Sequence, residues 1–249
     1  MLTPKKYFIV SGTYNAEKFV GKCIDSVNEQ ITDGFEIVHV VVDDGSVDGT
    51  AEIIKQHAGP RQVILTHHKN MGPIQSQLDG FSFAQSNGSD YDVIAQLDGD
   101  DWFSRVDAVK IVHDTYIKTA CGATYGNYKA TAKIASCCRI PDWTDLRKDL
   151  KNSGWPFSHL RTFRVGYTKH LVDTDLREEE GEYYVSAYDA VLYLPIAEMA
   201  GRDRVQYIDK ELVIYNMHNP IRDGVIRYFD QIRCASEIYS KTPYRQVNI

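Results

Sequence analysis

The N-terminal part of the chain alternates between two hydrophobic periods. Short runs rich in β-branched and aromatic residues predict strands at 6–11 (KYFIVS), 35–42 (FEIVHVVV), 62–66 (QVILT) and 91–97 (YDVIAQL). Segments with helical periodicity lie between them, at 16–30, 48–57 and 74–85. Strands that are nearly continuous apolar runs and alternate with helices are typical of a parallel sheet covered on both faces. The pattern therefore predicts a doubly wound α/β fold.

The second half of the chain has a less regular pattern. Apolar runs predict strands at 123–128 and 134–139, and two short strands within 204–220. Segment 141–160 holds two tryptophans, two prolines and a glycine without a clean period, which favours a loop. A C-terminal helix is expected over 222–240.

A further helix is predicted over 187–200. Ser186 and Asp189 have the spacing of a capping box at its start. Pro195 is expected to kink the middle of this helix, and Gly201 is expected to stop it.

The composition is that of a globular protein with an acidic balance. The chain has 249 residues, 43% of them hydrophobic, and a formal net charge of −6. This charge argues against a general nucleic-acid-binding protein, which needs a basic surface to displace counterions. The longest apolar runs are far below the roughly 20 residues of a membrane-spanning helix. We therefore expect one domain over residues 1–249 that neither binds nucleic acid nor spans a membrane.

Cysteine usage and the first residues bear on the cellular compartment. The five cysteines are an odd number without CxxC spacing. Such usage suits free thiols in a reducing compartment better than a disulfide framework or a zinc site. The opening MLTPKKYFIVSG has too short an apolar run for a secretory signal and lacks a small-residue cleavage site. We expect a cytoplasmic protein.

Polar residues follow each of the first four predicted strands. In chain order they are TYN at 13–15, DDGS at 43–46, HKNMG at 68–72 and DGDD at 98–101. Ligands of doubly wound sheets bind outside the carboxyl ends of the strands. We therefore expect these segments to line one crevice.

Each of these segments also has a purely structural interpretation. Asn15, Ser46 and Asp48 are residue types that cap helices, and Asp44 followed by glycine suits a turn. The acidic segment 98–101 is harder to explain as a solvated loop, because it directly follows a buried strand. The sequence contains neither a glycine-rich phosphate-binding motif nor the spacing of a calcium-binding EF-hand loop.

The acidic segment predicts a cation site. Asp98, Asp100 and Asp101 crowd three carboxylates into four residues at a strand end, where they repel one another. Carboxylate oxygens hold hard cations such as Mn²⁺ and Mg²⁺, and such a cation neutralises the charge of a diphosphate. Binding of metal and nucleotide therefore relieves the repulsion.

Taken together, these motifs resemble those of family 2 glycosyltransferases, which have the GT-A fold of nucleotide-diphospho-sugar transferases. The resemblance is carried by YFIVSGTYNAEKFVGKCIDSV, EIVHVVVDDGSVDGTAEII, NMGPIQSQLDG and QLDGDDW, in that order. It implies a GT-A fold with a mostly parallel sheet, a small second sheet and acceptor loops in the C-terminal half. Residues 1–105 would bind the nucleotide-sugar and residues 106–249 the acceptor.

The resemblance also implies an activity. It is the metal-dependent, inverting transfer of a sugar from a nucleotide-diphospho-sugar, favouring UDP-sugars, to a hydroxyl of a glycan or other acceptor. Two rival hypotheses are a nucleotidylyltransferase and a catalytically inactive protein that binds sugar nucleotides. The first normally carries a glycine-rich basic loop after its first strand, which SGTYNAEKF does not provide. The second would have lost the carboxylates of the DxD motif, and they are present.

The resemblance assigns the donor site to residues at the strand ends. The nucleotide pocket is expected to contain Thr13, Tyr14, Asn15, Asp44, Asn70 and Asp98. Asp44 would accept from the N–H of a uracil-type base, and Asp98 would approach the ribose. Asp100 would coordinate Mn²⁺ or Mg²⁺, with His218 as a further ligand or, alternatively, a surface histidine. Ser76-Gln77-Leu78 stands where the family often has Ala-Arg-Asn, so no pyrophosphate-binding arginine is expected there.

The acceptor site and the catalytic base are expected in the second half. Trp155, with Trp143 and Phe157, is expected either to stack on sugar rings or to pack in the core. His159 and Arg161 belong to HLRTFR, which resembles a family segment near the acceptor pocket; a structural salt bridge is the alternative for the arginine.

Asp189 is the predicted catalytic base, and helix capping is the alternative role for its carboxylate. The family usually has a Glu-Asp pair at this helix start. Tyr188 replaces the first member of the pair, so Asp189 is the only carboxylate that matches the motif.

Overall fold

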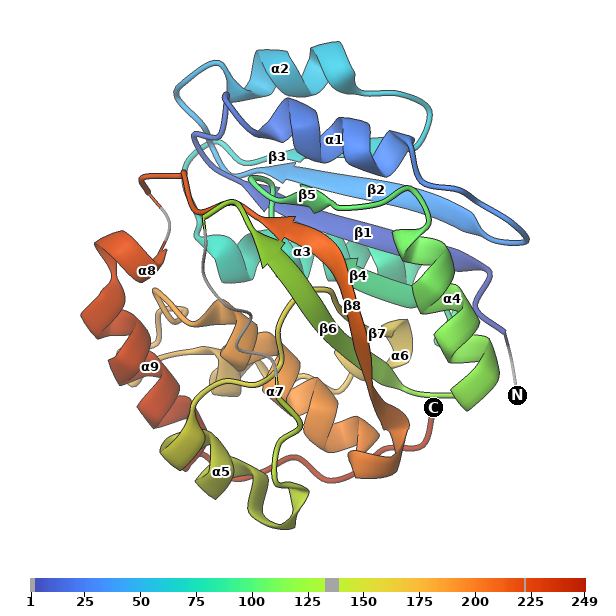
Figure 1. Ribbon diagram of the computed structural model, residues 1–249. Coiled ribbons are helices and arrows are strands. Elements are labelled where there is room, and N and C mark those ends of the chain that lie inside the picture. The colour runs from blue at the N-terminus through green and yellow to red at the C-terminus, as the bar shows by residue number, and fades with distance from the viewer. Residues whose placement is uncertain (1–2, 133–138, 222) are drawn as a thin grey trace.

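One eight-stranded sheet with helices on both faces forms the core of the protein (Figure 1). The computed structural model describes residues 3–132, 139–221 and 223–249. The strand order is β3-β2-β1-β4-β7-β6-β8-β5. The predicted α/β class with a mostly parallel, doubly wound sheet is confirmed.

The parallel half of the sheet lies where the hydrophobic pattern places it. Its strands are β1 (Lys6–Thr13), β2 (Glu36–Asp43), β3 (Gln62–Thr66) and β4 (Val93–Gln96). The intervening helices are α1 (Val20–Asn28), α2 (Thr50–His57) and α3 (Pro73–Asn87). All three strand pairings, β1 with β2, β1 with β4 and β2 with β3, are parallel.

Alternate residues of β1 point to opposite faces of the sheet, and both faces are buried. Tyr7 and Ile9 pack in one apolar cluster with residues of α1 and of α4 (Ala108–Thr119). Phe8 and Val10 pack on the other face with residues of α3 and of α7 (Tyr188–Ala200). Burying both faces explains why β1 is an unbroken apolar run rather than an alternating one.

The described strands of the second half all join the same sheet, so the separate small sheet that was expected is not formed by them. Strand β7 (Arg161–Arg164) is antiparallel to β4, and β6 (Ala123–Ala130) is antiparallel to β7. Strand β8 (Val205–Tyr215) is parallel to β6, and the short β5 (Trp102–Phe103) is antiparallel to β8.

Two strand predictions in this half need comment. The two short strands expected in 204–220 are a single strand, β8, whose register against β6 shifts around Asn127. Of the strand predicted at 134–139, residues 134–138 lie outside the described residues, and Arg139 belongs to no strand.

The loop predicted over 141–160 is wrong, because this segment contains a turn of 3-10 helix (Trp143–Asp145) and α5 (Leu146–Ser153). The side chains of Asp142 and Asp145 accept hydrogen bonds from the backbone N–H groups of Thr144 and Lys148, which caps both helices. Leu146 and Leu150 are the buried residues of α5. Two apolar positions are too few to give a clear helical period.

Helix α7 runs through Pro195 to Ala200 and is stopped by Gly201, as expected. Its N-cap is Ala187 in the left-handed conformation, with no side-chain cap, so the capping box is not formed. Shorter elements follow β7 and precede β8: α6 (Val165–Thr168) and 3-10 turns at Asp173–Leu176 and Arg202–Arg204. The single C-terminal helix expected is divided into α8 (Asp223–Ile226) and α9 (Tyr228–Ser240).

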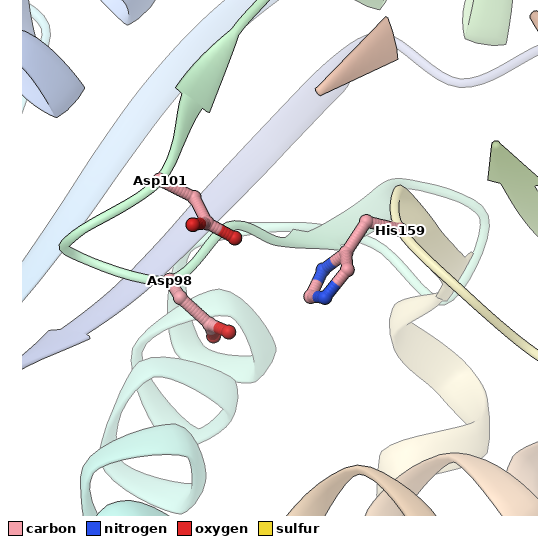
Figure 2. Close-up of side chains that lie close together, drawn as sticks. All are labelled: Asp98, Asp101 and His159. Carbon is pink, nitrogen blue, oxygen red and sulfur yellow. The ribbon is translucent and has the colours of Figure 1, made fainter. Parts of the chain in front are cut away.

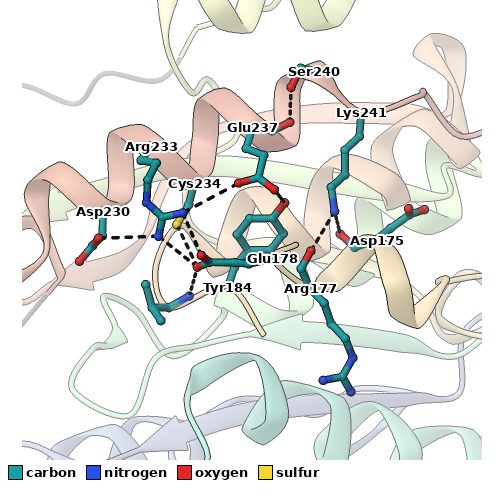
Figure 3. A network of polar contacts seen from close by, with 11 residues as sticks. Asp175, Arg177, Glu178, Tyr184, Asp230, Arg233, Cys234, Glu237, Ser240 and Lys241 are labelled. Atoms are coloured by element: carbon teal, nitrogen blue, oxygen red, sulfur yellow. Dashed lines mark hydrogen bonds and ion pairs between the residues drawn. The ribbon is translucent and has the colours of Figure 1, made fainter. Parts of the chain in front are cut away.

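A polar network attaches α9 to the segment that precedes α7 (Figure 3). Arg233 of α9 pairs with Glu178 at 2.8 Å, and the hydroxyl of Tyr184 donates to Glu237 at 2.7 Å. Lys241 donates to the backbone carbonyls of Asp175 and Arg177. The network fixes the segment that leads to the start of α7.

Gly80 allows α3 to lie close to β1. An alanine Cβ at this position would lie 2.3 Å from Cγ1 of the buried Val10. Overpacking costs about 1–3 kcal/mol, and a contact this short belongs at the upper end, about 2–3 kcal/mol, of which helix propensity returns about 1 kcal/mol. We expect Gly80→Ala to lower the free energy of unfolding, measured by chemical denaturation, by about 1–2 kcal/mol. Ser82→Ala, on an exposed position of the same helix, is the control, and equal stability of the two variants would contradict the close packing.

Candidate functional site

The loops after β1, β2 and β4 meet at one edge of the sheet. The N–H of Asn15 donates to Ser46 at 3.0 Å, and its side chain accepts from the N–H of Val47 at 2.9 Å. The N–H of Asp44 donates to the carbonyl of Thr13 at 2.9 Å. Asn15 therefore joins two loops rather than capping α1, whose N-cap is Phe19.

The acidic loop after β4 lies directly against the end of β1. The N–H of Gly99 donates to the carbonyl of Gly12 at 3.1 Å. A Cβ on Gly99 would lie 2.6 Å from the Cβ of Thr13, so only glycine fits between the two loops. Thr13, Asp44 and Asp98 are thus brought to the same edge, as the sequence predicted.

Two carboxylates and an imidazole converge beside this loop (Figure 2). The possible ligand atoms of Asp98, Asp101 and His159 all lie within 4.8 Å of one another. Asp101 is 1% exposed, and one of its oxygens accepts from the N–H of Asn216 at 2.8 Å. Its other oxygen, Oδ2, and Nδ1 of His159 are buried without a hydrogen-bond partner among the described residues.

Charge and burial adapt this cluster to a cation. Burial and the neighbouring Asp100 and Asp98 raise the pKa of Asp101. Burial and the nearby Arg161 lower the pKa of His159, so its imidazole is neutral at pH 7 and able to bind a metal. Leaving buried polar atoms unpaired costs about 1–3 kcal/mol each. A divalent cation bound by Asp101 and His159 would satisfy both orphaned atoms, so the residues fit the metal that the sequence predicts.

The two metal ligands expected from the sequence lie outside this trio. Asp100 is half-buried and accepts from the side-chain amide of Asn219 at 2.7 Å. His218 is exposed, and its backbone N–H donates to Asn216 at 3.0 Å. Asp101 was noticed in the sequence only as part of the acidic segment, and His159 only as an acceptor-site residue. Spacing cannot pair residues 58 positions apart in the chain.

The start of α7 is bound to the acidic loop. The hydroxyl of Tyr188 donates to Asp98. Arg161 is 1% exposed. Its Nη1 lies 3.7 Å from Oδ2 of Asp189, and its Nε donates to the side-chain carbonyl of Gln96 at 3.4 Å. Burial raises the pKa of Asp189, and Arg161 partly opposes this rise. The salt bridge considered for Arg161 is therefore formed with the predicted catalytic base.

At the far end of the site, Asp44 is almost fully buried. One of its oxygens accepts from the N–H of Met71 at 2.7 Å and the other from the N–H of Gly72 at 2.8 Å. Asn70, in the same loop, is exposed, as is Tyr14, 37% of whose surface is open to solvent.

The aromatic residues before β7 divide between core and surface. Phe157 is fully buried, with its ring centroid 5.0 Å from that of Tyr125 and 5.3 Å from that of Tyr193. Core packing is therefore its role. Trp155 is half-buried beside Phe157, and its Nε1 is another buried atom that finds no partner in the described parts of the chain.

Comparison with known proteins was made on sequence and on structure. Chondroitin synthase of Escherichia coli is 25% identical over 234 residues, which cover 92% of this chain and 32% of that protein. Across the curated relatives matched first, the chain spans 17%, 28% and 32% of their lengths. No helix within 3–132, 139–221 and 223–249 is both long and apolar enough to cross a membrane.

Solved structures with the same fold include nucleotide-sugar complexes. S. aureus TarS 1-349 in complex with UDP-GlcNAc has a TM-score of 0.63 at 19% identity, covering 86% of this chain and 59% of that chain. The mannosyltransferase PcManGT from Pyrobaculum calidifontis, in complex with GDP-Man and Mn²⁺, has a TM-score of 0.54 at 19% identity, covering 89% of this chain and 59% of that chain. The model of "Glycosyl transferase family 2" matches residues 8–163. The chain belongs to glycosyl transferase family 2.

Proposed function

We propose that this protein transfers a sugar, with inversion, from a nucleotide-diphospho-sugar to a hydroxyl of a glycan or other acceptor, and that it requires a divalent metal. The observation that carries the proposal is the cluster of Asp98, Asp101 and His159, in which Asp101 and His159 each have a buried atom without a partner in the described residues. Tyr188 connects this cluster to the helix start that bears Asp189. The proposed nucleotide-sugar site, the candidate metal ligands and the candidate base thus lie together at one edge of the sheet.

A UDP-sugar is the favoured donor. The carboxylate of Asp44 can accept about four hydrogen bonds. Three described neighbours, Met71, Gly72 and His67, lie at three of these acceptor positions. The remaining position suits the N–H of a uracil base. Thr13, Asn15 and Asp98 lie at the same edge, and TarS, which shares the fold, binds UDP-GlcNAc in its complex. Tyr14 and Asn70 are exposed at the rim, where they would contact the rest of the nucleotide.

The metal would be held by Asp98, Asp101 and His159, with Asp100 beside them. When bound, Mn²⁺ or Mg²⁺ neutralises the diphosphate leaving group. PcManGT, which also shares the fold, binds Mn²⁺ together with GDP-Man in its complex. His218 would join this set only if the exposed segment that carries it turned inward.

Asp189 would remove the proton of the acceptor hydroxyl. Its raised pKa makes it a stronger base than an exposed aspartate, and Arg161 keeps it ionised. The hydroxyl oxygen would then attack the anomeric carbon from the side opposite the leaving diphosphate, which inverts the configuration. Of the acceptor residues expected from the sequence, Trp155 stays a proposed acceptor contact, whereas His159 is proposed as a metal ligand and the buried Arg161 as the partner of Asp189. A cytoplasmic location stays a prediction, supported by the free, buried thiols of Cys23, Cys121 and Cys234.

Nucleotide specificity separates this activity from nucleotidyl transfer. We expect UDP with Mn²⁺ to raise the melting temperature more than GDP or UTP does, because ligands that bind only the folded state stabilise it in proportion to RT ln(1 + [L]/Kd). The measurement is a thermal-shift series with and without metal. A larger shift with UTP than with UDP would favour a nucleotidylyltransferase.

The two neighbouring carboxylates make different predictions for the metal. Asp101→Asn replaces a buried carboxyl group crowded by Asp98 and Asp100, so we expect the metal-free protein to melt at the same or a higher temperature and its shift with UDP and Mn²⁺ to shrink. Asp100→Asn and the exposed Asp33→Asn are measured beside it. A full metal-dependent shift in Asp101→Asn, with loss of the shift in Asp100→Asn, would identify Asp100 rather than Asp101 as the metal ligand.

Asp189→Asn keeps the size of the side chain but cannot take up a proton. We expect the transfer rate to fall about 10²- to 10⁴-fold while UDP and Mn²⁺ bind with unchanged affinity. Transfer rate, nucleotide affinity and melting temperature are measured on one preparation, with Asp33→Asn as the matched control. Wild-type transfer by Asp189→Asn would exclude Asp189 as the base, and a stability loss that accounts for the activity loss would assign it a structural role.

A further inference from the structure

A histidine that the sequence did not single out lies beneath Asp44. Nδ1 of His67, at the end of β3, lies 2.6 Å from Oδ1 of Asp44. Nε2 of the same ring lies 2.7 Å from Oδ2 of Asp79, in α3. Only 14% of the His67 side chain is exposed. The ring therefore bridges two carboxylates that come from different elements.

This geometry requires both ring nitrogens to carry a proton. A neutral imidazole has one donor nitrogen and one acceptor nitrogen, and its acceptor lone pair would face a carboxylate oxygen at hydrogen-bond distance. An imidazolium donates from both sides. A doubly protonated His67 in this position is a half-buried cation between two carboxylates.

The surroundings of the ring favour the charged form. From β2, Asp44 faces it, while the carboxylate of Asp43 accepts from the N–H of Ser46. From α3, Asp79 faces it and also accepts from the side-chain amide of Gln75 at 2.9 Å. Burial lowers the pKa of His67, but the hydrogen bonds and charges of Asp44 and Asp79 raise it above the ordinary value overall.

One further residue and a surface groove complete the environment of the His67 ring. Burial and the hydrogen-bonded Asp173 raise the pKa of Tyr183, from the segment before α7, with a smaller contribution from Asp79, so the phenol is uncharged at neutral pH. A shallow groove lined by His67, Asp79 and Phe83 opens the pair to solvent, so protons can exchange with water.

We propose that His67 is a positioning residue: its doubly protonated ring holds the Asp44 carboxylate in place for the uracil N–H, so that affinity for UDP depends on the protonation of His67. This inference rests on the proposed function, in which Asp44 recognises the base. The backbone donors Met71 and Gly72 hold Asp44 at all pH values, whereas the donor from His67 is the only one of the three that titrates.

The sign of the pH dependence follows from the raised pKa. The imidazolium is fully present below the ordinary histidine pKa of about 6.5 and is lost as the pH rises through the higher pKa of the folded protein. On deprotonation the ring keeps one hydrogen bond, and a lone pair then opposes the other carboxylate. Asp44 then keeps its two backbone donors but is held less tightly in the orientation that the base requires, and UDP affinity falls.

The test is the affinity for UDP with Mg²⁺ from about pH 6 to about pH 9, on both sides of the ordinary histidine pKa of about 6.5. We expect wild-type affinity to fall about tenfold across this range, the effect of one hydrogen bond to a charged group. His67→Asn can still donate to Asp44 but does not titrate, so its affinity should change far less with pH. Asp79→Asn removes one of the two anions, so its fall should come at lower pH than in wild type.

Two further measurements complete the test. His170→Asn, the same substitution at an exposed histidine outside the site, should follow wild type. Nitrogen chemical shifts of the His67 ring should show both nitrogens protonated near neutral pH and should titrate at lower pH in Asp79→Asn.

Two results would overturn the inference alone: a neutral His67 ring near neutral pH, or UDP binding with the same pH course in wild type, His67→Asn and Asp79→Asn. Absence of UDP binding in wild type at every pH would instead overturn the proposed function, and the inference with it. The two failures can be distinguished because the second is observed with the wild-type protein alone, whereas the first requires that wild type bind UDP.

Discussion

The repulsion among carboxylates at the end of β4 is the constraint around which the site is built. Asp98, Asp100 and Asp101 follow a strand that is buried on both faces, so water cannot screen all three charges. Each receives a different donor: Tyr188 for Asp98, Asn219 for Asp100 and the backbone of Asn216 for Asp101. The donors come from α7 and from the segment after β8, so the acidic loop joins the two halves of the chain.

Three carboxylates with proposed roles in the site each have a side-chain partner. Asp44 has His67, Asp98 has Tyr188 and Asp189 has Arg161. The partner is an imidazole at the first position, a hydroxyl at the second and a guanidinium at the third. A cation fixes a carboxylate and keeps it ionised, whereas a hydroxyl orients it without neutralising it. The hydroxyl partner of Asp98 adds no positive charge beside the proposed metal site.

Much of this could be predicted from the sequence, because the parallel half of the sheet is coded locally. Both faces of β1, β2 and β4 are largely buried, so each of these strands is a continuous apolar run, and polar residues at its carboxyl end fall at one edge of the sheet. That logic located Thr13, Asp44 and Asp98 correctly. The segment 141–160 was mistaken for a loop because α5 buries only Leu146 and Leu150, which leaves no period to detect.

The partners of these residues were decided by tertiary structure alone. His67 is separated from Asp44 by 23 positions, His159 from Asp98 by 61, and Tyr188 from Asp98 by 90. Helix propensity and hydrophobic period act over a few residues, so they cannot indicate which distant side chains will meet. Local sequence patterns specify the strands of the parallel half, the polar residues at their ends and the types of side chain available for chemistry. Packing of α7, β7 and the segment after β8 against the acidic loop decided which carboxylates are buried, which are paired and which atoms stay open to a metal.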